Sequence, residues 1–445
     1  MKNILVLGAG LSASSLIRYL LENSVNHEWE VRIVDQDINL VKSKINGHVN
    51  GVALSFNALD SDERRPEIEK ADLVISMLPA RFHIDVAKDC IELKTNLITP
   101  SYISPEMRAL DQAAKDAGIV IMNEIGVDPG LDHMSAMKII NEIKSKGGTV
   151  TSFKSFCGGL IAPESDNNPW NYKFTWNPRN VVLAGQGGAA SFIRNGQYKY
   201  IPYNRLFGRL DEISVEGYGD FVGYANRDSL SYRKTYGLED IPTIFRGTLR
   251  RPGYCKAWDV FIELGMTDDT YALVNTHGLT PRKFLNAFLP YDESKTVEEK
   301  FKDFLRPERM ETYDRFEWLD LFKDEPLLEM ENATPAQVLQ KILVAKLSLE
   351  PKDKDMLVMV HQFEYELNNK KFAISSHMVN IGEDQMYTSM SNTVGIPAAI
   401  CAKMILTGKL HKKGVTLPVE KEIYTPILAE LEEFDIRFVE SEREL

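Results

Sequence analysis

Residues 2–14 read KNILVLGAGLSAS, an apolar segment that runs directly into a glycine-rich turn. The apolar half predicts a buried strand, and the turn has the spacing GxGxxA, with Gly8, Gly10 and Ala13 at its three fixed positions. Gly8 permits a tight turn, Gly10 lets a pyrophosphate approach the backbone, and Ala13 allows the helix to pack closely on the strand. Leu11 lies in the same turn and is expected to contact the ligand. The stretch predicts a Rossmann dinucleotide-binding domain; the alternative is a glycine turn that binds no nucleotide.

The first 125 residues repeat this alternation of strand and helix. Short apolar segments separated by amphipathic helices are the pattern of βαβ units on a parallel sheet. The expected strands cover residues 3–8, 30–35, 51–56, 72–78, 96–101 and 118–124. One helix between them has clear ends, with Ser104 as N-cap, Pro105 in the first turn and Gly118 at the C-terminal stop. The fold class is therefore α/β.

Three parts are expected along the chain, because the composition changes after the Rossmann segment and again in a charged helical segment. They are a Rossmann dinucleotide-binding domain of residues 1–125 plus 391–445, a mixed α/β substrate-binding domain of residues 126–280 plus 356–390, and a small helical insertion of residues 281–355. Asn368 and Asn369 separate two strand-like segments and predict a hairpin. Thr425 and Pro426 predict the start of a helix.

The composition excludes several classes of function. The 445 residues include 52 Lys and Arg against 64 Asp and Glu, which gives a net charge of −12. A nucleic-acid partner is not expected, because no basic excess is available to neutralise phosphates. The four cysteines are far apart, so neither a metal site nor a disulfide framework is expected. We expect no signal peptide, no transmembrane segment and no membrane partner, and therefore a cytoplasmic protein.

The second expected strand ends in Asp35, about 22 residues after Ala13. An acidic residue at this position accepts hydrogen bonds from the ribose hydroxyls of the adenosine and repels a 2′-phosphate. Asp37 adds to this repulsion, and Arg32 lies inside the strand. NAD is therefore favoured as the cofactor, and NADP is the alternative. A solvated Asp35 in a turn is the structural alternative to both.

Ligands of an open parallel sheet bind beyond the carboxyl ends of its strands. This rule selects residues 76–83, 99–105 and 123–133, where Pro, Gly and polar residues follow the strands. The side chains expected there are Ser76, Leu78 and Pro79 on the cofactor side, and Ser101, Tyr102 and Asp128 on the substrate side. Asp128 could instead serve only as a helix N-cap.

Five segments resemble one known family, the saccharopine dehydrogenases of the glutamate-forming type, also called saccharopine reductases. They are SYISPEMRALDQAAKDAGI (101–119), MNEIGVDPGLDH (122–133), FCGGLIAPES (156–165) with the following NP and YKFTW, NRDS (226–229) and RGTLR (246–250). The resemblance runs in order from residue 1 to about 255, and continues more weakly through DMLVMVHQFE (355–364) and GVTLP (414–418).

The resemblance implies an enzyme of lysine metabolism that uses a nicotinamide cofactor. Its reaction would be the reversible interconversion of saccharopine with glutamate and 2-aminoadipate 6-semialdehyde through an imine. Saccharopine carries three carboxylates, so arginines and backbone amides should surround it. The family's substrate positions correspond to Ser101, Tyr102, Asp128, Cys157, Gly158, Arg227, Arg246, Gly247 and Thr248. The partner is then a small molecule, and a homodimer is compatible with the sequence.

The general acid or base of the reaction has four candidates: Asp128, Tyr102, His133 and Cys157. Imine hydrolysis needs a group that takes a proton from water, and we expect Asp128, together with Tyr102, to serve. No histidine adjoins Cys157 in the sequence, so Cys157 is interpreted as a small wall residue. Gly158 is interpreted as part of a backbone that passes close to the substrate.

Two departures from the family pattern limit the resemblance. Fungal members have an arginine just after the second strand, where this chain has Gln36, so their preference for NADP does not follow. The GQGG segment (185–188) is unexpectedly rich in glycine and has no assigned role. Two other functions stay open: a reductase of another amino-acid-derived imine, such as a carboxylated polyamine, and a non-enzymatic nucleotide-sensing protein.

Overall fold

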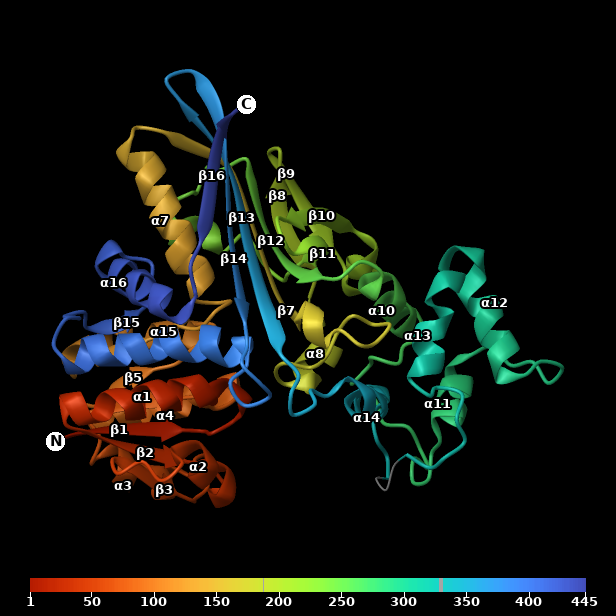
Figure 1. The fold of residues 1–445 in the computed structure, drawn as a ribbon, viewed down its shortest axis with the longest axis horizontal. Helices are drawn as coiled ribbons and strands as arrows, with labels where there is room; N and C mark the ends of the chain where they lie inside the picture. Colours follow the sequence, from red (N-terminus) through yellow and green to blue (C-terminus); the bar gives the residue numbers. More distant parts are fainter. Residues whose placement is uncertain (187, 328–330) are drawn as a thin grey trace. The chain divides into compact units, whose positions relative to one another are not determined.

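The computed structural model describes residues 1–186, 188–327 and 331–445. The chain forms two compact units, residues 1–150 with 359–445 and residues 151–358 (Figure 1). It passes between them inside two long strands, β7 (Thr149–Ile161) and β13 (Asp355–Leu367). These units divide the chain at other positions than the three expected parts, because α7 (Leu131–Ser145) packs against α16 (Lys421–Leu431) of the C-terminal segment. The three-part division therefore stays a prediction.

The first unit contains a parallel sheet with the strand order β15-β6-β5-β4-β1-β2-β3. Its strands are β1 (Lys2–Leu7), β2 (Trp29–Val34), β3 (Gly51–Leu54), β4 (Leu73–Ser76), β5 (Asn96–Ile98), β6 (Val120–Met122) and β15 (Gly414–Thr416). The order reverses at β1, which pairs with β2 on one side and with β4 on the other. This is the doubly wound order of a Rossmann domain, and the α/β prediction is confirmed.

The helices of the first unit follow its strands, and the single helix predicted between Ser104 and Gly118 is divided into α5 (Pro105–Ala109) and α6 (Asp111–Asp116). The helices are α1 (Ser14–His27), α2 (Ile38–Ile45), α3 (Ser61–Ile68), α4 (His83–Glu92), α5, α6, α7, α15 (Ser389–Leu406) and α16. Ser104 caps α5 by accepting a hydrogen bond from the Met107 amide at 3.1 Å, as expected. The predicted helix start at Pro426 is wrong, because α16 begins at Lys421 and contains the proline.

Helix α15 packs along α1, and Figure 1 shows the two side by side. A Cβ at Gly395 would lie 2.8 Å from the Leu16 amide nitrogen, so only glycine permits this approach. The C-terminal segment thus covers the helix that follows the GxGxxA turn, which buries Leu16 and Ile17 completely.

The first unit also contains an antiparallel hairpin that ends in an exposed edge. β13 turns into β14 (Lys370–Ile381) through Asn368 and Asn369, whose φ values are 51° and 61°. Positive φ at both central residues is the requirement of a type I′ turn, so the predicted hairpin is confirmed. β14 pairs in turn with β16 (Val439–Glu444).

The second unit is built around β12 (Thr243–Arg250), which pairs parallel with β7 and antiparallel with β11 (Gly219–Ala225) and β8 (Ala190–Arg194). β10 (Leu210–Val215) and β9 (Gln197–Ile201) pair with β11 and β8. The helices are α8 (Pro178–Val182), α9 (Tyr232–Thr235), α10 (Tyr254–Glu263), α11 (Pro281–Phe288), α12 (Val297–Arg309), α13 (Tyr313–Trp318) and α14 (Pro335–Leu347). The segment expected to be helical carries α11 to α14.

An aromatic cluster forms much of the core of the second unit. The Trp170 ring stacks on Phe261 with centroids 5.6 Å apart, and it meets Phe316 edge-on at 5.8 Å. Trp258 also contacts Trp170 edge-on, at 6.4 Å. These contacts hold the segment after β7 against α10 and α13.

Candidate functional site

The glycine turn has the conformation that a dinucleotide requires. Gly8 has a φ of +99°, and a Cβ there would lie 3.2 Å from the Met77 carbonyl oxygen, so the chain itself requires this glycine. Gly10 has a φ of −63°, and a Cβ there would meet no protein atom within 4 Å. The absence of a side chain at Gly10 thus leaves a free approach to the backbone, which fits a pyrophosphate. Ala13 is buried beneath the turn, and Leu11 is half exposed at its edge.

Asp35 fastens the end of β2 to the glycine turn. Its carboxylate accepts a hydrogen bond from the Ala9 amide at 2.9 Å and another from the Asp37 amide at 3.2 Å. Asp37 in turn caps α2 by accepting from Asn39 and Leu40. The Asp35 carboxylate is thus held at the glycine turn and Asp37 caps α2, while the binding of a ribose by Asp35 stays a prediction.

Lys44 is a cation at the glycine turn that the sequence analysis missed. Its ammonium group donates to the Gly10 carbonyl oxygen at 2.6 Å, and its side chain is buried. Burial lowers the pKa of Lys44 to about 8, while the nearby Asp35 charge opposes this shift. Nothing in the sequence separates Lys44 from the exposed Lys42 of the same helix.

A buried histidine connects the ends of β4 and β5. The Ser76 hydroxyl lies 2.9 Å from His83 Nδ1, and His83 Nε2 lies 2.8 Å from the Ser101 hydroxyl. Burial lowers the pKa of His83 to about 4, so its ring is neutral at physiological pH. Ser76 and Ser101 are thus brought together through a residue that sequence reasoning missed. Leu78 and Pro79 lie in the connection between them.

Tyr102 and Asp128, both expected on the substrate side, are joined by a hydrogen bond. The Tyr102 hydroxyl donates to Asp128 Oδ1 at 2.7 Å, across 26 positions of the sequence. Asp128 precedes a cis peptide bond to Pro129. The N-cap of α7 is Gly130, so the alternative role of Asp128 as a helix cap is wrong.

A second buried pair holds the two segments that carry Tyr102 and Asp128. Glu124 Oε2 lies 2.7 Å from His133 Nε2, and Glu124 Oε1 accepts from the Ile103 amide at 2.9 Å. The Glu124 amide donates to the Ser101 carbonyl oxygen at 3.2 Å. His133 has no exposed surface, so it supports this arrangement from inside and is a poor candidate for the general base. Glu124 was not predicted, because nothing in the sequence distinguishes a buried glutamate from a solvated one.

The remaining expected substrate residues lie in the second unit, on β7, on β12 and, for Arg227, in the turn after β11. Cys157 is the register partner of Thr248, and its side chain is buried. A Cβ at Gly158 would lie 2.6 Å from the Leu249 carbonyl oxygen, and one at Gly247 would lie 2.7 Å from the Phe156 ring. Packing between strands therefore requires both glycines. Their interpretation as a backbone that approaches a ligand stays a prediction.

The two expected arginines are joined through one turn. The Asn226 amide donates to the Arg246 carbonyl oxygen at 2.8 Å, and the Arg246 amide donates to the Ser229 hydroxyl at 2.9 Å. Arg227 lies in this turn and is exposed, whereas Arg246 is buried with its guanidinium 4.0 Å above the Tyr232 ring. The NRDS and RGT segments thus form one structural element.

Arg250 is a buried cation in the second unit that was not predicted. Its guanidinium lies 5.1 Å from the Tyr172 ring centroid, 5.3 Å from Tyr254 and 5.9 Å from Tyr224. Burial raises the pKa of Tyr172 to about 12, so this hydroxyl keeps its proton. The cluster joins β12, α10 and the segment after β7 through cation–π contacts.

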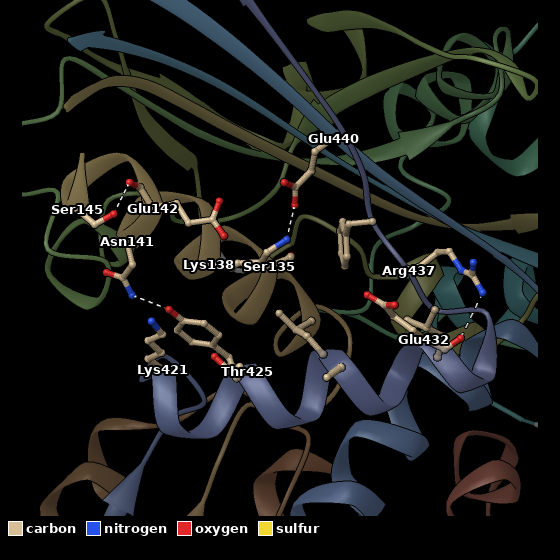
Figure 2. Close-up of a pocket in the computed structure, with 15 residues that line it drawn as sticks. Ser135, Lys138, Asn141, Glu142, Ser145, Lys421, Thr425, Glu432, Arg437 and Glu440 are labelled. Carbon is tan, nitrogen blue, oxygen red and sulfur yellow. Dashed lines mark hydrogen bonds and ion pairs between the residues drawn. The ribbon is translucent and has the colours of Figure 1, made fainter. Parts of the chain in front are cut away.

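A cavity of about 380 Å³ lies elsewhere in the first unit, between α7 and α16 (Figure 2). Lys138 pairs with Glu440 across it at 2.9 Å, and Asn141 donates to Tyr424. None of the expected site residues lines it. In the described part of the chain no three His, Cys, Asp or Glu side chains are placed to hold a metal ion, and none of the described helices could span a bilayer. Gly187 of the GQGG segment lies outside the described residues.

Two family profiles together match nearly the whole chain. The profile of the saccharopine dehydrogenase NADP binding domain matches residues 4–122, and that of the saccharopine dehydrogenase C-terminal domain matches residues 126–436. The apo saccharopine dehydrogenase (L-Glu forming) of Saccharomyces cerevisiae superposes over 100% of both chains with a TM-score of 0.90 and 31% identity.

This chain covers different shares of two curated relatives. The mitochondrial alpha-aminoadipic semialdehyde synthase of Rattus norvegicus is 35% identical over 98% of this chain, which spans only 47% of that protein. The saccharopine dehydrogenase (NADP(+), L-glutamate-forming) of Schizosaccharomyces pombe is 33% identical over 99% of both chains. The chain thus spans about half of the first relative and nearly all of the second.

Proposed function

Because this chain belongs to the saccharopine dehydrogenase family, we propose that it is a nicotinamide-dependent oxidoreductase acting on a CH–NH group. Its reaction is the reversible interconversion of saccharopine with L-glutamate and 2-aminoadipate 6-semialdehyde, in lysine metabolism. The observation that carries this proposal is the end-to-end similarity to the Schizosaccharomyces pombe enzyme, whose name states this reaction type. The substrate is a small molecule, and the proposal includes a cytoplasmic homodimer.

The glycine turn and the neighbouring strand ends fit the dinucleotide. Gly8, Gly10, Leu11 and Ala13 would hold the pyrophosphate, because Gly10 leaves the backbone accessible at the start of a helix. Asp35 would bind the adenosine ribose. The end of the fourth strand would contribute contacts from Leu78 and Pro79, whereas Ser76, also expected there, is completely buried and would act only through its hydrogen bond with His83. When bound, the nicotinamide ring accepts or supplies the hydride.

Asp35 and the related proteins favour different cofactors. The matched profile and the names of the fungal relatives favour NADP. We propose NAD for this chain, because the Asp35 carboxylate at the end of β2 would repel a 2′-phosphate and Gln36 supplies no charge to bind one. Lys44 is already engaged with the Gly10 carbonyl oxygen.

Proton transfer is assigned to the Tyr102–Asp128 pair. Asp128 takes a proton from the water that attacks the imine carbon, and it returns a proton in the reverse direction. The Tyr102 hydroxyl orients the carboxylate through its 2.7 Å hydrogen bond. Glu124 and His133 keep the two segments in place from the interior.

In the second unit, the proposed substrate residues are those that match the family's substrate positions. Arg227 and Arg246 bind carboxylates of saccharopine, and Thr248 adds a hydroxyl donor. Cys157 forms part of the wall, with Gly158 and Gly247 supplying backbone at the same strands. No thiol chemistry is required.

The test is an assay of the purified full chain with saccharopine and either NAD or NADP, followed at the absorbance of the reduced nicotinamide. We expect saccharopine-dependent reduction of NAD, with a lower rate for NADP. Reduction of NADP alone would contradict the role of Asp35, and no reduction of either would contradict the proposed reaction.

The matched variants are Asp128→Asn, which removes the proposed base, and Asp116→Asn, an exposed carboxylate on α6. Loss of a general base should lower kcat about a hundredfold or more. Asp116→Asn should leave kcat unchanged. Equal activity of both variants would remove Asp128 from the mechanism.

A further inference from the structure

His83 is the first residue of α4, and both of its ring nitrogens have a serine partner. Nδ1 lies 2.9 Å from the hydroxyl of Ser76 at the end of β4, and Nε2 lies 2.8 Å from the hydroxyl of Ser101 after β5. His83 is 3% exposed and Ser76 is 0% exposed. This chain of three side chains links the strand end expected at the cofactor to the strand end expected at the substrate.

The burial of Ser76 determines which nitrogen of His83 carries the proton. A neutral imidazole has one N–H donor and one acceptor nitrogen. Within the described residues, His83 Nδ1 is the acceptor that the Ser76 hydroxyl reaches. If Nδ1 carried the proton, the Ser76 O–H would be buried without an acceptor, which is unfavourable. Ser76 therefore donates to Nδ1, and the proton of the ring is on Nε2.

The state of Ser101 follows from this tautomer. Its hydroxyl oxygen accepts the hydrogen bond from Nε2–H, so the hydroxyl proton is directed to another partner. The Ser101 backbone is held as well, because its carbonyl oxygen accepts from the Glu124 amide at 3.2 Å. Ser101 is half buried and directly precedes Tyr102, which binds Asp128. Its free O–H is then a fixed donor at the substrate side.

We propose that His83, held by Ser76 as the Nε2–H tautomer, is a positioning residue that presents the Ser101 hydroxyl as a hydrogen-bond donor to a carboxylate of the substrate. The identity of that carboxylate rests on the proposed function. The chain of side chains does not conduct protons, since it ends at the completely buried Ser76. Burial also keeps the ring neutral, with a pKa of about 4, so the arrangement persists across neutral pH.

The first test does not depend on activity. The full chain with ¹⁵N-labelled histidine is studied by NMR, and the His83 signals are assigned by their loss in His83→Gln. We expect the shifts of a neutral ring protonated at Nε2. In Ser76→Ala the preference should weaken, because Nδ1 loses its donor. A ring protonated at Nδ1, or a ring charged near neutral pH, would overturn the proposal.

The second test separates positioning from structural support by kinetics. His83→Leu removes the donor to Ser101, and we expect the saccharopine KM to rise about tenfold, with kcat and the dinucleotide KM changed less than about twofold. His83→Gln places an amide N–H near the former Nε2, so it should recover most of the loss. An unchanged melting temperature of His83→Gln shows that the fold is intact.

Ser101→Ala completes a double-mutant cycle. Because His83 acts through the Ser101 hydroxyl, adding His83→Leu to Ser101→Ala should raise the KM no further. A further tenfold rise in the double variant would overturn the proposal, as would a His83→Gln variant no better than His83→Leu. If the wild type shows no saccharopine activity, the proposed function fails, and the NMR experiment still decides the tautomer.

Discussion

At the scale of single residues, the two glycines of the N-terminal turn have separable tasks. Gly8 is required by the fold, through a φ of +99° and the Met77 carbonyl oxygen, whereas Gly10 has an ordinary φ and free space. Gly10→Ala should therefore keep the wild-type melting temperature and weaken dinucleotide binding at least about tenfold, whereas Gly8→Ala should lose about 1–2 kcal/mol of stability. Thermal denaturation and a binding titration check both. Unweakened binding by Gly10→Ala would place the pyrophosphate elsewhere.

The exposed arginine of the NRDS turn, Arg227, provides a test of substrate binding. Arg227→Ala should raise the saccharopine KM about thirtyfold, because a charge-assisted contact to a carboxylate is lost, with little change in the dinucleotide KM. The matched control is Arg209→Ala, which also removes an exposed arginine of the second unit. Steady-state kinetics measure both constants. Equal increases in both KM values would argue against a substrate role of Arg227.

His83 also makes stability depend on pH. Burial lowers its pKa from the ordinary 6.5 to about 4, so between these values the unfolded chain binds a proton that the folded chain does not. The free energy of unfolding should then decrease by on the order of 3 kcal/mol as the pH falls from about 6.5 towards 4. Denaturant unfolding of the wild type and of His83→Gln at several pH values checks this. On acidification the wild type should lose stability relative to His83→Gln, and a difference that stays constant with pH would contradict this.

At the scale of elements, the close pairing of β7 and β12 explains why residue 158 is a glycine. The sequence analysis had attributed Gly158 to the approach of a ligand. A Cβ at Gly158 would lie 2.6 Å from the Leu249 carbonyl oxygen. Gly158→Ala should therefore cost about 1–3 kcal/mol of stability, measured by denaturant unfolding. Gly208→Ala is the control, since a Cβ there meets no protein atom within 4 Å. A normal stability with a raised saccharopine KM would instead support the ligand role.

The elements that could be predicted are those whose signals are local. The strand and turn of residues 2–14, the Ser104 cap and the Asn368–Asn369 hairpin each depend on a few adjacent residues, and all are confirmed. The predicted helix start at Pro426 was wrong because a proline also fits inside a helix whose first turn precedes it.

At the scale of the whole molecule, the site could be predicted only in part, because its supporting residues are selected by long-range burial. The rule that ligands bind at strand ends located Ser101, Tyr102 and Asp128. It selected the segments that contain His83 and Glu124 without singling out either residue, and it did not select Lys44, because all three look like ordinary surface residues until the fold buries them. The same is true of Arg250 among its tyrosines. Backbone patterns thus identify where a site lies, and three-dimensional packing identifies what positions it.

The distribution of tryptophan gives the two compact units different optical signals. Trp29 lies in the first unit, whereas Trp170, Trp176, Trp258 and Trp318 lie in the second, where the Trp170 cluster is fully enclosed. Intrinsic fluorescence should therefore report mainly on melting of the second unit, and circular dichroism on both. Coincident midpoints for the two signals would mean cooperative unfolding of the entire chain, while a dinucleotide-induced shift in the dichroism alone would mean that the units melt independently.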